Sequence, residues 1–540
     1  MSAASEHRVG RVVCVSGAQV VMVIEREARA DAGTAPAPLQ KGSLVKMAAP
    51  EGVIFGIVSG LSIPVPASGP ERNAADPEIR LAELELIGEA QAGEDGCAPV
   101  FRRGVSEFPA LGDAVLPVTR DDLACVYAPP ASSTVRIGTV HLNRAQPVLI
   151  SPDDLLGKHF AVLGTTGCGK SCAVALILQR LLESHANAHV LLLDPHNEYS
   201  RAFAGAAEVL GPESLQLPYW LLNSEEIASV ILGCRPQSQD GGAISAILGE
   251  LIPLAKSMLQ RERYGARHIT VDTPLPYRLT DLHQLLDDAM GRLEKPESLT
   301  PYRWLRSRLD VLAADSRFAF MFGGISVQDT MVRILSRLFR IPVNGRPVTI
   351  IDLSGVPSEV LNVVVSVVCR MTFDFALWSR GAQPILLVCE EAHRYAPANP
   401  ALGFEPTKEA LARIAKEGRK YGVSLCIVSQ RPSELAPGIL SQCNTTFAFR
   451  LTSLRDQEIV RGLTTDGAHG LLDFLPSLGD AEAIAAGEGV TLPLRLRFDP
   501  LPAERQPHSG TARFSSSWQR ASKDEAFVAK VVERWRRQQR

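Results

Sequence analysis

Short apolar runs separated by turn residues fill the first part of the chain. Between residues 8 and 145 these runs are bounded by Gly, Pro, Asn and Asp, which mark the ends of strands. Runs of this length and spacing are typical of a small β-barrel. Residues 26–40 break the pattern and are expected to form an exposed loop. The clearest strand candidates are residues 11–15, 18–25, 42–50, 53–63 and 80–90.

From about residue 146 the pattern changes to wholly apolar strands that alternate with helices. A strand of a parallel sheet is covered by helices on both faces, and it therefore reads as one continuous apolar run. The pattern predicts an α/β domain with a mostly parallel sheet. Its strand candidates are residues 159–164, 189–194, 348–355, 385–391, 423–430 and 445–451.

Two further segments follow helical spacing. Between 221 and about 341 no strand is evident, and residues 243–259 and 302–313 predict a helical insertion in the α/β domain. At the chain end Phe527, Val531 and Trp535 recur on one face of a predicted helix, with arginines opposite. The predicted organisation is a barrel over 1–145, a core over 146–500 with its insertion at about 221–341, and a tail over 501–540 with a terminal helix.

Composition limits the number of domains and the classes of site that the chain can contain, but it does not indicate a function. A chain of 540 residues has room for two or three domains, and its net charge of −3 does not point to nucleic acid, although a ring can concentrate basic groups on its inner wall. The ten cysteines lack zinc-site spacing and read as buried residues of a reducing compartment. Neither a signal peptide nor an uninterrupted apolar run long enough to span a membrane is evident, so a cytoplasmic location is expected.

The stretch AVLGTTGCGKSCAVAL at 161–176 contains G-x-x-x-x-G-K-[ST] in full, after an apolar strand and before an apolar helix. Its glycines let backbone N–H groups converge on phosphate oxygens, and the helix N-terminus adds its positive end. Lys170 is expected to reach the β- and γ-phosphates of ATP, and the Ser171 hydroxyl to join the shell of Mg²⁺. A metal held by the two cysteines would compete with the nucleotide. The expected nucleotide contacts are Gly164, Thr165, Thr166, Gly167, Cys168, Gly169, Lys170, Ser171 and Cys172.

A phosphate loop of this class needs acidic residues at a second strand end, and ILLVCEEAHRYAP supplies Glu390 and Glu391. Glu390 is expected to assist Mg²⁺ through water. Its side chain is longer than the Asp that many such proteins carry there, which shifts its reach. Glu391 is expected to polarise the attacking water as a general base. A Glu-Glu pair often marks only a solvated helix start, but here a buried apolar strand delivers it, which favours a functional role.

Two further motifs leave alternatives open. Gln430 ends the strand VSLCIVSQ and can sense the γ-phosphate or orient water, or it can serve as a plain strand cap. The run KEGRKYG at 416–422 is either a solvated helix end, where cations are favoured, or the source of an arginine for a neighbouring subunit's nucleotide. Composition alone does not choose between these readings.

Taken in order, the motifs resemble the HerA family of ring-forming DNA translocases, which are relatives of FtsK-type motors. The matching motifs are RVGRVV, GIVSGL, KHFAVLGTTGCGKS, LLLDPHNEYS, CEEAHRYAP, RIAKEGRKYGVSLCIVSQRP and FAFRLTSLRDQEIVRGL, spread over roughly residues 8–500. The resemblance implies a small barrel followed by a RecA-like ATPase domain. It also implies a homo-hexamer with double-stranded DNA in its central channel.

The resemblance assigns roles on the nucleotide side. Lys170 and Ser171 take the phosphate-loop roles, Glu391 the catalytic role and Gln430 the sensor role, while Asp194 falls in the second acidic motif and is expected to contact the nucleotide. That motif usually has Gly before Glu-Tyr. Here Asn197 stands in its place, and because Asn tolerates left-handed backbone, the turn is expected to survive.

The resemblance also implies residues that act across a subunit seam. Arg419 is the first candidate for the trans-acting arginine, with Arg413 and Lys420 as rivals, and Lys158 stands where the family often has a basic residue that reaches across. The terminal helix could brace a neighbouring subunit or touch nucleic acid. Arg303, Arg306 and Arg308 are candidates for the DNA channel, or they form a solvated helix face.

The function implied by the resemblance is an ATP-dependent translocase or helicase on double-stranded DNA. In this family the motor commonly works with a nuclease of the NurA type in DNA end processing, or with another effector in phage defence. One alternative is a ring-shaped ATPase scaffold that gates a bound effector. Another is a conjugation-type pump ATPase, for which a membrane anchor would have to come from another subunit.

Overall fold

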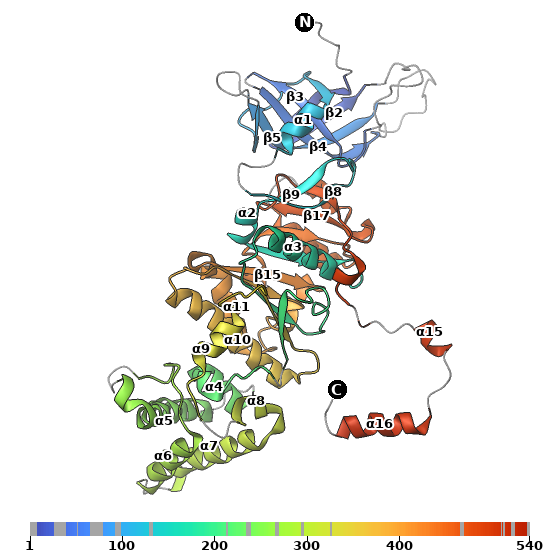
Figure 1. Ribbon diagram of the computed structural model, residues 1–540. Helices are drawn as coiled ribbons and strands as arrows, with labels where there is room; N and C mark the ends of the chain where they lie inside the picture. Colours follow the sequence, from blue (N-terminus) through green and yellow to red (C-terminus); the bar gives the residue numbers. More distant parts are fainter. Residues whose placement is uncertain are drawn as a thin grey trace, which may run out of the picture.

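The computed structural model describes residues 8–25, 39–50, 52–64, 79–91, 99–128, 133–211, 214–233, 239–264, 269–292, 296–323, 327–464, 469–508, 510, 514–519 and 524–536. The molecule is elongated, with the barrel at one end, the α/β domain in the middle and the helical insertion at the other end (Figure 1). The predicted loop at 26–40 lies almost wholly outside the described residues.

Six antiparallel strands close into the predicted N-terminal barrel, in the order β2-β1-β7-β3-β4-β5, and the pairing of β2 with β5 completes the ring. Alternate side chains such as Val12, Met22 and Met47 point inward and are fully buried. Helix α1 (Arg120–Val126) packs against β6, and Lys46 of β3 pairs with Asp122 of this helix at 2.9 Å. The barrel strands are β1 (Gly10–Ser16), β2 (Gln19–Ile24), β3 (Leu44–Ala49), β4 (Gly52–Ser62), β5 (Leu81–Gln91) and β7 (Ala114–Pro117), with β6 (Val100–Arg103) added beside β5.

The second sheet confirms the predicted α/β fold and all six of its predicted strands. Its parallel part has the order β12-β13-β11-β14-β15-β10-β16, so β15 lies between β10 and β14. The five residues of β10 are all buried, as expected for a strand covered on both faces. The parallel strands are β10 (His159–Leu163), β11 (Val190–Asp194), β12 (Ala207–Leu210), β13 (Val348–Asp352), β14 (Ile385–Cys389), β15 (Val423–Ser429) and β16 (Cys443–Ala448).

Four antiparallel strands extend this sheet beyond β16 in the order β17-β18-β8-β9. Strand β8 lies within 1–145, the range predicted for the barrel, yet it pairs with β18 and β9 of the larger sheet. The chain therefore changes sheets between β7 and β8, before the predicted boundary at 145. A short alternating strand looks the same in either sheet, because the pattern records burial and not the partner. These strands are β8 (Val135–Val140), β9 (Pro147–Ile150), β17 (Glu482–Gly487) and β18 (Leu494–Phe498).

Helices cover the parallel strands. Helix α10 (Ser358–Trp378) packs on α11, β14 and β15 and is largely buried, which accounts for its apolar length in a core helix. A second helical stretch long and apolar enough to span a membrane by composition, residues 241–259, lies in the insertion and packs on its neighbouring helices. The remaining helices of the domain are α2 (Pro152–Leu156), α3 (Lys170–Ser184), α11 (Glu405–Glu417), α12 (Pro437–Leu440), α13 (Leu454–Leu463) and α14 (His469–Leu472).

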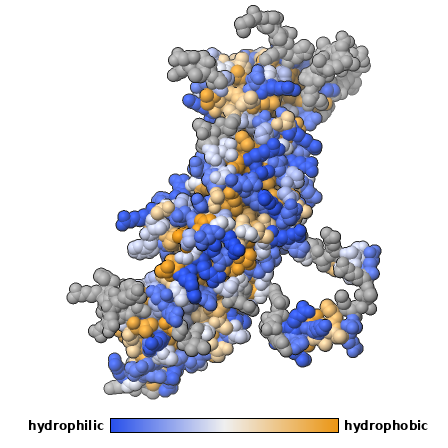
Figure 2. Space-filling model, viewed as in Figure 1, coloured by the Kyte–Doolittle hydropathy of each residue, from blue (hydrophilic) through white to orange (hydrophobic). Residues whose placement is uncertain are grey.

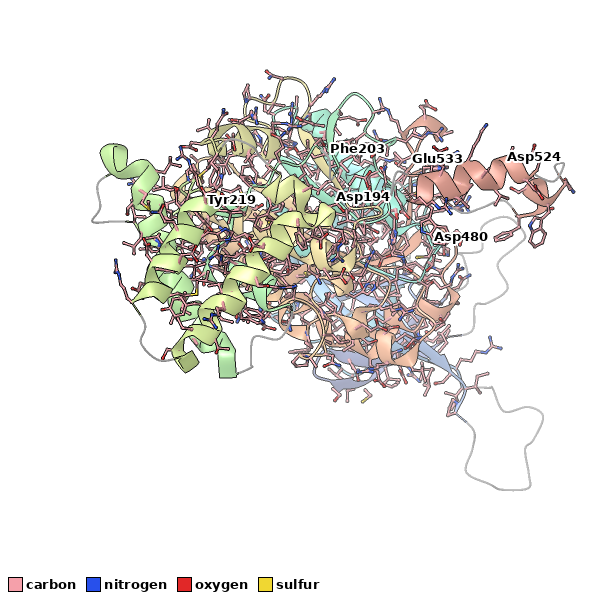
Figure 3. The ribbon with its side chains drawn as sticks, turned by 90° about the horizontal axis from the view of Figure 1, so that it is seen from below. Asp194, Phe203, Tyr219, Asp480, Asp524 and Glu533 are labelled. Atoms are coloured by element: carbon pink, nitrogen blue, oxygen red, sulfur yellow. The ribbon has the colours of Figure 1, made fainter. Side chains whose placement is uncertain are left out.

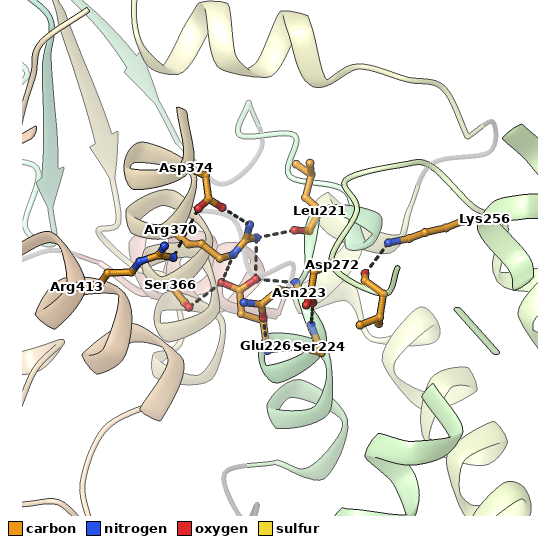
Figure 4. Close-up of polar contacts among 11 residues, drawn as sticks. Leu221, Asn223, Ser224, Glu226, Lys256, Asp272, Ser366, Arg370, Asp374 and Arg413 are labelled. Atoms are coloured by element: carbon orange, nitrogen blue, oxygen red, sulfur yellow. Dashed lines mark hydrogen bonds and ion pairs between the residues drawn. The ribbon is translucent and has the colours of Figure 1, made fainter. Parts of the chain in front are cut away.

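The predicted insertion is helical: the described residues between β12 and β13 contain no strand. A buried ion pair fastens it to the core, because Glu226 at the start of α4 accepts hydrogen bonds from Arg370 and Ser366 of α10 (Figure 4). Asn223 caps α4 and shares Glu226 in a capping box. The insertion helices are α4 (Ser224–Leu232), α5 (Gln239–Tyr264), α6 (Leu279–Gly291), α7 (Pro296–Ala314), α8 (Ala319–Phe322) and α9 (Met331–Leu338).

After β18 the chain passes beside helix α3 before it leaves the α/β domain. Arg505 lies 3.5 Å from Glu183 of α3, and the backbone N–H of His508 donates to the carbonyl oxygen of Glu198. Beyond this contact α15 (Phe514–Trp518) and α16 (Glu525–Arg536) extend from the body with no buried residue (Figures 1 and 2). Trp535 of α16 is 74% exposed.

Candidate nucleotide-binding and catalytic site

The phosphate loop joins the end of β10 to the start of α3, and its backbone needs glycine. A Cβ at Gly164 would come within 2.5 Å of the Cβ of Phe449, and Gly169 has a φ of +105°. Gly169 is also the N-cap of α3, and no side chain caps the helix there. The first N–H groups of α3 therefore face the loop with their hydrogen-bonding capacity available, which suits a phosphate.

Neighbouring strand ends hold the loop in place. The N–H of Thr165 donates to the carbonyl oxygen of Arg450 at 2.9 Å, and the N–H of Gly164 donates to that of Ser429 at 3.2 Å. Lys170 donates its ammonium to the carbonyl oxygen of Thr165 at 2.8 Å, so its charge lies over the loop. The sequence motif FAFRL contains Arg450, but the sequence does not predict its contact with the phosphate loop. Its contact is made by the backbone, and no side-chain pattern signals that.

The two loop cysteines differ in their surroundings. Cys168 is buried and its Sγ donates to the carbonyl oxygen of Thr165 at 2.8 Å, whereas Cys172 is exposed on the first turn of α3. No group of three or more His, Cys, Asp or Glu side chains among the described residues is arranged to hold a metal. Cys168 therefore packs the inside of the loop.

The acidic pair follows β14 and reaches the same edge of the sheet as the loop, because parallel strands end on one side. Glu390 is 2% exposed, and the hydroxyl of Tyr199 donates to its Oε2 at 2.8 Å. Burial raises the pKa of Glu390 to about 8, and the neighbouring charge of Glu391 adds to this, while the bond from Tyr199 opposes it. Tyr199 was missed as a site residue, because its contact joins segments far apart in the sequence.

The donor set fits Mg²⁺. Ser171 and Glu390 offer only oxygen atoms, and Mg²⁺ usually takes one or two protein oxygens, with water and substrate phosphates completing its shell.

Asp194, expected to contact the nucleotide, binds a turn of its own chain. It is fully buried inside the domain (Figure 3), and its carboxylate accepts the backbone N–H groups of His196, Glu198 and Tyr199 at 3.3, 3.1 and 2.9 Å. These bonds give the expected nucleotide contact of Asp194 no support. They fix the turn that brings Tyr199 to Glu390. Within that turn Asn197 has a φ of +52°, which confirms that Asn preserves the left-handed backbone.

Gln430 bridges the loop and the acidic strand. Its Nε2 donates to Oε1 of Glu391, and its Oε1 accepts from the hydroxyl of Thr166. Glu391 is 3% exposed and has a φ of +52°. Three segments that are separate in the sequence thus meet through one amide, which is more than a plain strand cap requires.

The residues predicted to act across a subunit seam lie at the opposite edge of the sheet. Arg419 lies in the short helix η6 (Gly418–Tyr421), four positions before β15 begins, and Lys158 immediately precedes β10. The phosphate loop follows β10, so about 16 Å of strand separates these residues from it. Arg419 is exposed, whereas Lys158 pairs with Glu488. The rival Arg413 stacks on Phe373 at 4.1 Å, and the rival Lys420 is exposed.

Two of the three arginines considered for a DNA channel are engaged within the insertion. Arg308 donates through Nε to the carbonyl oxygen of Ile231 at 2.9 Å, and Arg306 pairs with Asp287. Arg303 lines an open hollow beside Arg306. These contacts favour a structural role for Arg308.

Replacing Glu390 by Gln is expected to stabilise the protein without nucleotide at high pH. The pKa of Glu390 is higher in the folded than in the unfolded chain, so the wild type loses stability as pH rises towards and through about 8. Gln carries no charge to bury and can still accept from Tyr199. Melting curves at pH 9 should show the variant about 2–4 °C above the wild type, with a narrower gap at pH 6. A gap that does not change with pH would contradict this account.

The phosphate loop, the acidic pair one strand away and the polar strand tip between them define a P-loop ATPase with a RecA-like core. Residues 135–372 match the family described as "Helicase HerA, central domain". Over these residues the chain is similar to the HerA family.

Curated relatives of the chain carry the same family name. The DNA double-strand break repair helicase HerA of Pyrococcus furiosus is 26% identical over 420 residues, which cover 72% of this chain and 73% of the relative. The protein of that name from Sulfolobus acidocaldarius is 26% identical over 437 residues, covering 79% and 80%. Among solved structures, VirB4 of Thermoanaerobacter pseudethanolicus is similar with a TM-score of 0.49 and 17% identity, covering 69% of this chain and 98% of that one.

Proposed function

We propose that this protein is an ATP-driven motor on double-stranded DNA, a translocase or helicase that works as a homo-hexameric ring in the cytoplasm. The relatives that bear the name of a DNA double-strand break repair helicase support the choice of DNA as the track. The near-neutral net charge of −3 is compatible, because only the channel wall needs to be basic.

One observation carries the proposal. Arg419 and Lys158 lie at the edge of the sheet opposite the phosphate loop of their own chain. Neither can reach its own nucleotide, whereas a ring of identical subunits brings this edge against the neighbour's loop. ATP then sits at a seam, and hydrolysis in one subunit acts on the next.

Within each site the residues divide the work. Lys170 and the N–H groups at the start of α3 hold the phosphates, and Glu391 takes the proton of the attacking water. Ser171, and Glu390 through water, would hold Mg²⁺. Mg²⁺, when bound, neutralises phosphate charge. Gln430 links the loop to Glu391, and Arg419 from the neighbour stabilises charge on the transferring phosphoryl group.

The proposal includes a partner, either a nuclease of the NurA type that cuts the DNA ends which the motor exposes, or an effector in phage defence. No contact of the described residues identifies it. Both kinds of partner are proposed from the resemblance to the HerA family and from the DNA ends on which such a motor would act.

The steady-state ATPase rate with and without linear duplex DNA tests the function. A motor should hydrolyse ATP several-fold faster with duplex, and the stimulation should fall as salt rises, because the contacts are to phosphates. Lys170→Ala, which is expected to bind ATP poorly, serves as the inactive control. A rate that ignores duplex DNA but follows an added partner protein would instead identify a scaffold that gates an effector.

A further inference from the structure

His393 lies beside the proposed general base. Its Nδ1 is 3.3 Å from Oε2 of Glu391 and 3.2 Å from the hydroxyl oxygen of Ser429, at the end of β15. It belongs to the short helix η5 (Ala392–Arg394), which packs against β15.

The backbone at Glu391 makes this contact possible. Glu391 has a φ of +52°, and the chain turns there so that Nδ1 of His393, two residues on, lies 3.3 Å from its carboxylate. Left-handed backbone is unfavourable for a residue with a side chain. Strain of this kind persists where the surroundings fix it, and here it places the imidazole.

The two oxygens of Glu391 have different surroundings. Oε1 accepts from Nε2 of Gln430, whereas Oε2 is buried and receives no well-formed hydrogen bond from any described residue. The imidazole of His393 is the donor group placed to approach it. A carboxylate approached from both sides cannot rotate freely, and a general base must present one oxygen to water in a fixed direction.

The charge of His393 suits this task. Burial lowers the pKa of His393, against the pull of Glu391 and Glu434 and with the repulsion of Arg431 and Arg394. The ring is therefore neutral at neutral pH. An ionised Glu391 favours the tautomer with the proton on Nδ1, since a bare nitrogen would repel the carboxylate. A neutral donor orients the carboxylate without cancelling the negative charge that attracts the proton of water.

We propose that His393 is a positioning residue for Glu391, and that its Nδ1 and the amide of Gln430 together hold the carboxylate in the direction needed to activate water. The inference depends on the proposed function, in which Glu391 is the general base. His393 itself touches neither ATP nor the attacking water.

Steady-state ATPase kinetics of His393→Ala, His393→Asn and His393→Gln in the full-length chain test this role. The Ala variant should lose about 10- to 100-fold in kcat, with the KM for ATP changed by less than about 2-fold, because binding is not involved. Asn places an amide near the position of Nδ1 and should recover most of the rate. Gln places its amide near Nε2 and should be about as slow as Ala.

Controls separate positioning from folding and from the proposed function. His185→Ala, at the far end of α3, should match the wild type in kcat. Melting curves verify that each variant folds, and titration with a fluorescent ATP analogue verifies that it binds nucleotide. An Ala variant with wild-type kcat, or an Asn variant as slow as Ala despite normal folding and binding, would overturn the role of His393. Near-normal turnover in Glu391→Gln would instead overturn the general base on which the inference depends.

Discussion

Replacing Glu391 by Gln is expected to leave ATP binding intact and to slow hydrolysis by about 100- to 10,000-fold, the range that a general base supplies. Gln has the same shape and can still accept from the amide of Gln430, so the site should keep its geometry. It cannot take a proton from water. Titration with a fluorescent ATP analogue and measurement of phosphate release in a single turnover should show tight binding with almost no product.

Mixtures of inactive subunits extend this test to the seam. Glu391→Gln subunits retain Arg419, and Arg419→Ala subunits retain the general base, so a mixed ring contains seams with both groups intact. Some activity should return at intermediate ratios. No recovery at any ratio would argue against Arg419, and near-normal hydrolysis by Glu391→Gln alone would show that another group is the base.

Replacing Lys170 by Ala is expected to weaken ATP binding by at least about 100-fold, because a charge-assisted contact to the phosphates is lost. The side chain also donates to the carbonyl oxygen of Thr165 and thus helps to shape the loop. Binding of the analogue, followed by fluorescence, measures the loss. Lys530→Ala on the exposed helix α16 makes the same change in charge and should bind like the wild type.

The parallel core could be predicted because burial on both faces leaves a plain signal. The apolar runs at β10, β11 and β14 predict buried parallel strands, and G-x-x-x-x-G-K-[ST] predicts a phosphate loop between a strand and a helix. Asn197 could be placed as well, because its left-handed backbone depends on local chemistry.

The remainder depends on contacts between distant segments. Strand β8 reads like a barrel strand, yet it pairs with β18 and β9 of the larger sheet. Asp194 is expected to contact the nucleotide because it falls in the second acidic motif of the resembled family, whereas its carboxylate accepts N–H groups of its own turn. Tyr199 and His393 stood in motifs already noted, yet their partners depend on how the strands are ordered and on one unusual φ at Glu391.

The chain enters and leaves the ATPase domain on adjacent strands. Strand β8, which follows the barrel, is paired with β18, which precedes the tail, and Arg136 of β8 lies 2.9 Å from Asp499 just after β18. The N-terminal barrel and the C-terminal segment are therefore joined to the same rim of the sheet, formed by β8 and β18. A rotation of this rim moves both points of attachment. A displacement of this rim would therefore move the N-terminal barrel and the segment that leads to α15 and α16 together.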